Sequence, residues 1–179
     1  MGLIQWHGFA PLRFIVLFSI VFYTLHWGYQ KASGTVIEKA LIDIATVRPS
    51  VFIINQWQST ERVHAQGHLL VSSQVKLSVL KGCEGTESLF LIIAAILAFR
   101  SSWRHTLAGL ASGTIVIYLA NQTRIVALYF ALRHDRELFA ALHGYIAPTL
   151  IIAVGCLFYL WWIQWSHWKT PKQSSFTPA

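Results

Sequence analysis

The chain has 179 residues, of which 55% are hydrophobic and only 12% are charged. Soluble domains usually contain about 25% charged residues, so the composition indicates an integral membrane protein with one domain spanning residues 1–179. The formal net charge is +7, but the basic residues are scattered singly, which argues against a nucleic-acid partner. The two cysteines provide neither a disulfide framework nor the CxxC spacing of a zinc site, and we expect no cofactor.

Long apolar stretches predict an all-α polytopic membrane protein with about four transmembrane helices. We expect these spans at about residues 11–29, 86–99, 107–132 and 138–165. The first stretch could instead be a secretory signal peptide. No small-residue cleavage site follows it cleanly, and this favours a retained helix.

Aromatic residues mark the ends of the first and last spans. Pro11 is tolerated in the first turn of a helix, and Trp27 and Tyr29 are expected at the far interface of that span. The last span ends in a cluster that is typical of an aromatic belt and precedes a polar tail at residues 169–179. This cluster consists of Trp161, Trp162, Trp165 and Trp168.

The outer segment at residues 30–82 has a more polar character than the spans. Residues 36–47 place apolar and charged side chains on opposite faces, which predicts an interfacial helix that ends at Arg48-Pro49. A second apolar piece follows at residues 51–57. Alternation of polar and apolar residues at 64–80 predicts a small β-hairpin that leads to Cys83.

The distribution of Lys and Arg bears on orientation. With the amino end in the cytoplasm, the inner side holds five basic residues and no acidic one, namely Arg13, Arg100, Arg104, Lys169 and Lys172. Of the other nine basic residues, Arg124 lies within an expected span, and eight face outward together with all seven acids. The rule counts Lys and Arg rather than net charge, so the short 100–104 turn and the basic tail are what favour this orientation.

Three polar residues lie at one predicted depth. Helical rise gives about 25 Å from Arg100 back to Cys83, about 26 Å from Leu107 to Arg124 and about 33 Å from Trp165 to His143. These lengths approximate the ~30 Å hydrocarbon core. We therefore expect Cys83, Arg124 and His143 near one outer boundary, on three helices.

Each of these residues also has an ordinary structural interpretation. A lone cysteine is often a small buried residue, and an arginine can extend to lipid head groups. His143 competes with four other histidines, at His26, His64, His68 and His134. The coincidence of depth favours a functional interpretation over the separate alternatives.

Local sequence suggests how Cys83 is activated. It lies between two glycines where a helix begins, and the helix dipole there is expected to lower the thiol pKa. Glu84 and Glu87 fit first-turn acids favoured by the dipole better than catalytic groups. Cys156 lies about 20 Å from His143 along the same helix, too far to share its chemistry.

Three short motifs resemble those of the exosortases and archaeosortases, a family of membrane transpeptidases. They are Gly82-Cys-Glu-Gly85, Asn121-Gln-Thr-Arg124 and Leu142-His-Gly-Tyr145, in the family's order. The similarity covers residues 34–165. It is greatest to the short, four-span bacterial forms such as the M and H exosortase groups.

The resemblance implies a cysteine transpeptidase that cleaves a carboxy-terminal sorting signal of exported proteins and transfers them to an acceptor. Cys83 would be the nucleophile, His143 the general base and Arg124 the oxyanion-stabilising group, with Asn121, Glu84 and Glu87 as supporting candidates. The implied partners are exopolysaccharide-associated exported proteins that carry a short motif, an apolar helix and a basic tail. The implied location is the bacterial inner membrane, among its lipids, with the site on the periplasmic side.

Two other classes of function remain open at this stage. In a non-catalytic assembly or transport factor, Arg124 and His143 would form a polar packing contact. A haem or quinone protein could use His26 and His143 as paired ligands. A rhomboid-type serine protease is disfavoured because no serine occupies a Gly-x-Ser-x-Gly turn.

Overall fold

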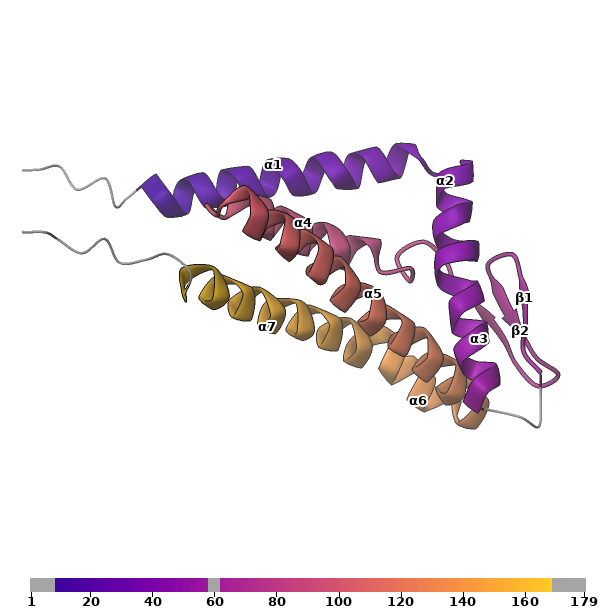
Figure 1. Cartoon of the computed structure of the whole chain (residues 1–179). Coiled ribbons are helices and arrows are strands. Elements are labelled where there is room, and N and C mark those ends of the chain that lie inside the picture. Colours follow the sequence, from indigo (N-terminus) through magenta and orange to yellow (C-terminus); the bar gives the residue numbers. More distant parts are fainter. Residues whose placement is uncertain (1–8, 58–61, 169–179) are drawn as a thin grey trace, which may run out of the picture.

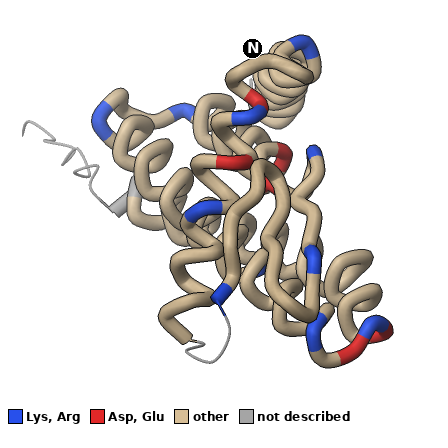
Figure 2. Tube along the Cα trace, turned by 90° about the vertical axis from the view of Figure 1, so that its right-hand side faces the viewer, with Lys and Arg blue, Asp and Glu red and all other residues tan. Residues whose placement is uncertain are grey.

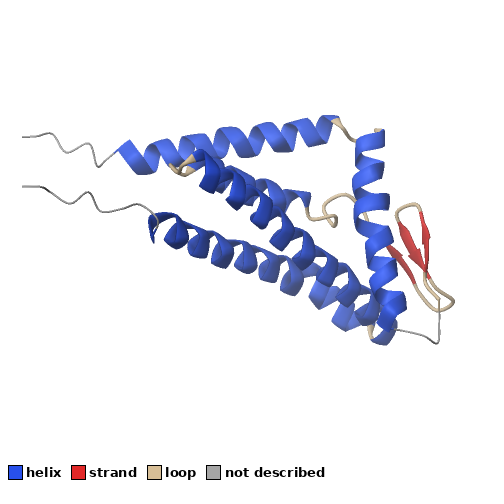
Figure 3. Cartoon of the chain, in the orientation of Figure 1, coloured by secondary structure: helices blue, strands red, loops and turns tan. Residues whose placement is uncertain are grey.

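The computed structural model describes residues 9–57 and 62–168, most of which are helical (Figures 1 and 3). The bundle consists of α1 (Phe9–Lys31), α4 (Thr86–Ala98), α5 (Trp103–His134) and α7 (Ala147–Trp168). The predicted helical membrane fold is confirmed. The polar tail expected at residues 169–179 lies outside the described residues.

Three helical segments in the described part of the chain are long and apolar enough to cross a membrane. They are Pro11–Lys31, Trp103–His134 and Arg136–Trp165. The span expected at residues 86–99 is an apolar helix, α4, but it has only 13 residues. At ~1.5 Å per residue α4 is about 20 Å long, which is shorter than the ~30 Å hydrocarbon core.

Close packing between α5 and α7 depends on Gly109. A Cβ at this position would overlap the indole ring of Trp162, so a small residue is needed for the two helices to approach. The Trp162 side chain is fully buried, and its Nε1–H donates to the His105 carbonyl at 3.2 Å. The aromatic-belt prediction is therefore wrong for Trp162, whereas Trp161 is exposed.

A continuous helical segment lies across one end of the bundle (Figure 1). It consists of α2 (Val36–Lys39), the π-helical η2 (Ala40–Val47) and α3 (Arg48–Trp57). The predicted break at Arg48-Pro49 is wrong. The wider π-helical turns end directly before this pair, so the missing N–H of Pro49 and the bulk of its ring are accommodated without ending the helix.

Buried hydrogen bonds attach this crossing segment to α5. The Ser50 hydroxyl donates to Oε1 of Gln122 at 2.7 Å, and Nε2 of Gln122 donates to the Ala45 carbonyl at 3.1 Å. Ser50 and Gln122 are both buried, so each bond replaces a lost contact with water. The crossing segment is thereby fixed to α5 at this end of the bundle.

A small antiparallel sheet covers the outer side of the crossing segment, with strand order β1-β2-β3. Its strands are β1 (His64–Gln66), β2 (Leu69–Val71) and β3 (Lys76–Ser78). The region predicted as a hairpin therefore forms three strands rather than two. Leu70 and Leu77 are paired across β2 and β3, and both are buried, so this face of the sheet joins the hydrophobic core.

The two ends of the bundle are formed by different parts of the chain. The first turn of α1, the α4–α5 turn and the end of α7 lie together, opposite the sheet (Figure 1). Seen from the sheet end, Lys and Arg are spread along the trace rather than gathered in one patch (Figure 2). The remaining helical pieces, α6 (Arg136–Ala141) and the π-helical η3 (Leu142–Ile146), lead from this end directly into α7.

Candidate active site

The glycines on either side of Cys83–Glu84 both adopt left-handed backbone conformations, with φ +92° at Gly82 and +83° at Gly85. The Cys83 N–H donates to the Leu80 carbonyl at 2.9 Å, which closes this turn. Gly85 is the N-cap of α4. The thiol therefore lies in a tight turn just before the helix, outside the apolar span.

Gly85 also brings two of the sequence motifs into contact. A Cβ at Gly85 would lie 2.7 Å from Cγ and 2.9 Å from Oδ1 of Asn121 on α5. Such distances are far below a normal van der Waals contact, so only glycine fits here. Asn121 is itself 2% exposed, and the turn with Cys83 is thereby pressed against the helix that carries Arg124.

Glu84 is buried and hydrogen-bonded rather than solvated in the first turn of a helix. Its Oε1 accepts hydrogen bonds from the Tyr29 hydroxyl at 2.7 Å and from the Thr86 hydroxyl at 2.9 Å. Its Oε2 is buried and has no partner within the described part of the chain. The prediction of a first-turn acid is wrong for Glu84, whereas Glu87 does lie in the first turn of α4 and is exposed.

Tyr29 is the partner that the sequence did not reveal. It was expected at the membrane interface, but its side chain is buried and contacts Phe90 edge-on at 5.9 Å between ring centroids. The Tyr29–Glu84 hydrogen bond joins α1 to the turn that carries Cys83. A tyrosine near a helix end is common in membrane proteins, so no sequence signal distinguishes this one.

Cys83 and His143 line the same cavity, which has a volume of about 300 Å³. Three parts of the chain form its walls. They are residues 76–83, which include strand β3, the last three turns of α5, and the α6–η3 segment. The other lining residues are Lys76, Leu77, Ser78, Val79, Leu80, Ile125, Leu128, Leu132 and Phe139. No hydrogen bond joins the thiol to the imidazole among the residues that the structure describes, and catalytic pairs often tighten only when substrate binds.

His143 lies in the π-helical stretch η3, inside a helix that is otherwise regular. Its ring stacks on Phe139, with 5.5 Å between ring centroids and 7° between the planes. Single π-helical turns within helices often occur at functional sites because they redirect a side chain. The exposed His143 ring is thus held on one face by an aromatic neighbour.

Arg124 completes the group from α5. Its guanidinium charge lowers the pKa of the Cys83 thiol, so it lies close enough to act on it electrostatically. Its Nε is buried and donates no hydrogen bond to another described residue. A buried, unused N–H donor beside a thiol is a group that could bind a developing oxyanion.

Burial nevertheless raises the pKa of the Cys83 thiol above its ordinary value. The charge of Arg124 opposes this effect, the carboxylate of Glu84 adds to it, and the backbone contact with Leu80 opposes it. The expectation that the helix start lowers this pKa is wrong in direction, because desolvation outweighs the favourable charges. A free thiol would therefore need a base nearby to react as thiolate.

The other candidate residues lie elsewhere. His26 accepts or donates a hydrogen bond with Gln30 at 3.2 Å and lines a hollow on α1, apart from the cavity of His143. His64, His68 and His134 are exposed. In the described ranges no group of three or more His, Cys, Asp or Glu residues is arranged to hold a metal ion.

Comparison with known proteins gives one match. A family model described as transmembrane exosortase matches residues 2–162. Searches among curated proteins and among solved structures each gave no match. The matched range includes all three motifs and every residue of the turn, cavity and hydrogen bonds described above.

Proposed function

Because this chain belongs to the transmembrane exosortase family, we propose that it is a cysteine transpeptidase in which Cys83 is the nucleophile, His143 the general base and Arg124 the oxyanion-binding group. Membership implies a membrane transpeptidase that acts on exported proteins with carboxy-terminal sorting signals. The roles of these three residues are those that the resemblance of the sequence motifs implies, and the geometry of the site supports them.

One observation carries the assignment: Cys83 and His143 line one cavity. Arg124 is not among the residues that line it, but its charge acts on the Cys83 thiol. A half-buried thiol with a raised pKa is a poor nucleophile alone, so it requires a base within reach. His143 is the histidine that lines the cavity. The unused Nε–H of Arg124 supports the third role, since it has a donor free for a substrate oxygen.

The proposed reaction proceeds in two halves. His143 accepts the proton of the Cys83 thiol as sulfur attacks the scissile carbonyl carbon, and Arg124 stabilises the resulting oxyanion. The C–N bond then breaks, His143 returns the proton to the leaving amine, and a thioester remains on Cys83. An amine or hydroxyl acceptor attacks the thioester and gives its proton to His143, and protonation of the leaving thiolate restores Cys83.

The proposal also states in which membrane the protein lies, on which side its active site faces, and what sorting signal its substrates carry. Arg13, Arg100 and Arg104 belong to the bundle end opposite the turn of Cys83. This distribution supports a cytoplasmic side for the three arginines and a periplasmic side for the turn of Cys83. The membrane would be the bacterial inner membrane. The substrate would carry a short motif, an apolar helix and a basic tail at its carboxy terminus.

Substitution of Cys83 tests the function. In membranes with Cys83→Ala, exported proteins should retain their carboxy-terminal signals, whereas Leu157→Ala, at a side chain that is 67% exposed on α7, should process them normally. Mass spectrometry of the carboxy-terminal peptides provides the measurement and identifies the substrates. Wild-type protein with little acceptor should accumulate a substrate adduct that hydroxylamine releases, since hydroxylamine cleaves thioesters.

His143→Ala should lose nearly all processing, and His134→Ala, its exposed counterpart at the end of α5, should lose little. Undiminished processing by Cys83→Ala would refute the transpeptidase assignment. A non-catalytic role in membrane assembly would then be the better account of these residues.

A further inference from the structure

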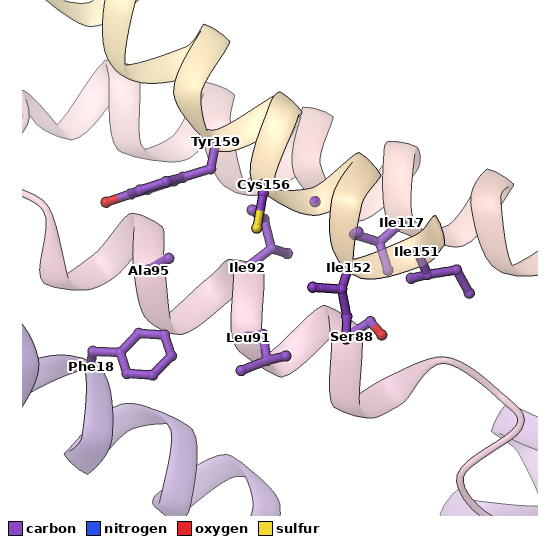
Figure 4. A pocket seen from close by; sticks show the side chains of 11 residues that line it. Phe18, Ser88, Leu91, Ile92, Ala95, Ile117, Ile151, Ile152, Cys156 and Tyr159 are labelled. Atoms are coloured by element: carbon purple, nitrogen blue, oxygen red, sulfur yellow. The ribbon is translucent and has the colours of Figure 1, made fainter. Parts of the chain in front are cut away.

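An apolar groove runs between α1, α4 and α7, below the turn of Cys83. Its volume is about 270 Å³, and its walls are almost entirely apolar. Figure 4 shows the Cys156 sulfur extending from α7 toward α4, with Phe18 of α1 on the far side of α4. The lining residues are Phe18, Ser88, Leu91, Ile92, Ala95, Ile117, Ile151, Ile152, Gly155, Cys156 and Tyr159.

The groove is continuous with the helices that form the candidate active site. Ser88 of α4 lies five residues after Cys83, and Ile151 of α7 lies eight residues after His143. At ~1.5 Å per residue along one continuous helical stretch, Ile151 is about 12 Å below the level of His143, and Ser88 is the third residue of α4, which begins directly after the turn of Cys83. A helix lying in the groove would therefore lead its polar amino-terminal extension to the cavity between Cys83 and His143.

The groove also lies inside the membrane-spanning region, where an apolar helix is the expected ligand. Its inner part, at Cys156 and Tyr159, is about 20 to 24 Å from the level of His143. A Cβ at Gly155 would contact Ile117 of α5 at 3.4 Å, so α7 and α5 pack closely where they line the groove. Small residues on a helix surface let a second helix pack closely in lipid.

We propose that this groove binds the apolar helix of the substrate's carboxy-terminal sorting signal and so sets where the chain is cut. The inference rests on the proposed function and adds the binding site for the substrate. The groove walls on α4 and α7 span about two helical turns each, from Ser88 to Ala95 and from Ile152 to Tyr159. One face of a single bound helix would fill them.

The proposal fixes a distance along the substrate. Cys156 lies 13 residues after His143 in one continuous helical stretch, which corresponds to about 20 Å. A substrate helix lying alongside should therefore contact Cys156 roughly 13 residues after the scissile bond if it is helical throughout. An extended segment at its start would reduce this number.

Cys83→Ala makes a direct cross-linking test possible, because it blocks turnover and leaves Cys156 as the single cysteine. The probe is a substrate identified by its retained signal in that variant, carrying one cysteine at successive positions of its apolar helix. Oxidation in membranes should join it to Cys156 most strongly near the thirteenth position, with a repeat every three to four residues.

The neighbouring residue Leu157 provides the matched control. It is 67% exposed and lies about 100° further round α7, outside the groove. With Cys83→Ala and Cys156→Ala combined, Leu157→Cys should give an adduct at most one-tenth as strong. Equal adducts from both positions, or an adduct between two copies of this chain in place of the substrate, would overturn the groove assignment.

A second variant tests the groove without cross-linking. Cys156→Trp should fill it and raise the KM for the substrate at least tenfold, with little change in kcat, while Leu157→Trp should leave both near wild type. Processing that depends on Cys83 but is indifferent to Cys156→Trp and forms no adduct at Cys156 would leave the transpeptidase function standing and remove the groove from it.

Discussion

In the proposed mechanism, Arg124 acts on Cys83 in two ways that substitutions can separate. Its charge lowers the pKa of a thiol that burial raises, and its planar guanidinium offers N–H donors to an oxyanion. Arg124→Gln removes the charge, so the Cys83 thiol should become thiolate only at higher pH than in wild type. Arg124→Lys keeps a charge but loses the planar donor geometry.

We expect Arg124→Lys to leave the thiol titration nearly unchanged while processing falls by ~10²–10³, as when an oxyanion donor is removed. The pH dependence of iodoacetamide alkylation, measured with Cys156→Ala as background, reports the thiol alone. Near-normal processing by Arg124→Lys would reduce Arg124 to a source of charge.

Gly85 and Gly82 differ in what surrounds them, although both have positive φ. Gly82 faces open space, whereas a Cβ at Gly85 would strike Asn121. Gly82→Ala should therefore cost about 1–2 kcal/mol of stability from backbone strain alone. Gly85→Ala should cost more and displace the turn of Cys83.

Thermal unfolding midpoints in detergent compare the two variants. Addition of Asn121→Ala should recover part of the loss in Gly85→Ala, because it removes Cγ and Oδ1 but leaves the strained φ. It should recover none in Gly82→Ala. Equal losses in the two glycine variants would mean that Gly85 and Asn121 do not pack as described.

At the residue scale, the sequence predicted positions better than environments. The spacing of Cys83 and His143 from their helix ends placed them at one depth, and both line one cavity. The direction of the shift in the Cys83 pKa was predicted wrongly. The sequence shows that a helix begins there, but it does not show the burial that raises the pKa. Likewise, Glu84 lies only three residues before a second acid, Glu87, in sequence, yet its buried partner Tyr29 is 55 residues away.

At the scale of the elements, Tyr29 attaches α1 to the active-site turn. Tyr29→Phe removes a donor from a buried carboxylate, which should destabilise the protein by about 1–3 kcal/mol and reduce processing. Tyr23→Phe is the matched control, since Tyr23 lies on the same helix but is exposed. Unfolding midpoints and processing rates that are the same in both variants would show that the Tyr29–Glu84 hydrogen bond contributes nothing.

Element boundaries follow the sequence where apolar periodicity is long, as in α5 and α7. They depart from it where backbone hydrogen bonding changes type. The π-helical η2 carries the helix through Arg48-Pro49, and the π-helical η3 holds His143. Neither has a sequence signature, because the wider turn is stabilised by packing against α5 rather than by local propensity.

At the scale of the whole molecule, the orientation makes a simple prediction about the two cysteines. A membrane-impermeant maleimide added to intact spheroplasts should label Cys83, tested in Cys156→Ala, because its turn lies at the sheet end of the bundle. Cys156, tested in Cys83→Ala, should stay protected by its place in the apolar groove. Labelling of Cys83 only after the inner leaflet is exposed would invert the orientation.

The short helix α4 has a consequence for the surrounding lipid. Its 13 residues span about 20 Å, so together with the α4–α5 turn at its inner end it stops short of the outer surface of a ~30 Å hydrocarbon core. We expect the bilayer to thin on that outer side to relieve the mismatch, which would bring head groups and water down to Cys83. Longer acyl chains would oppose such a deformation, so under the proposed function the length of the lipid tails becomes a determinant of how readily the thiol meets its acceptor.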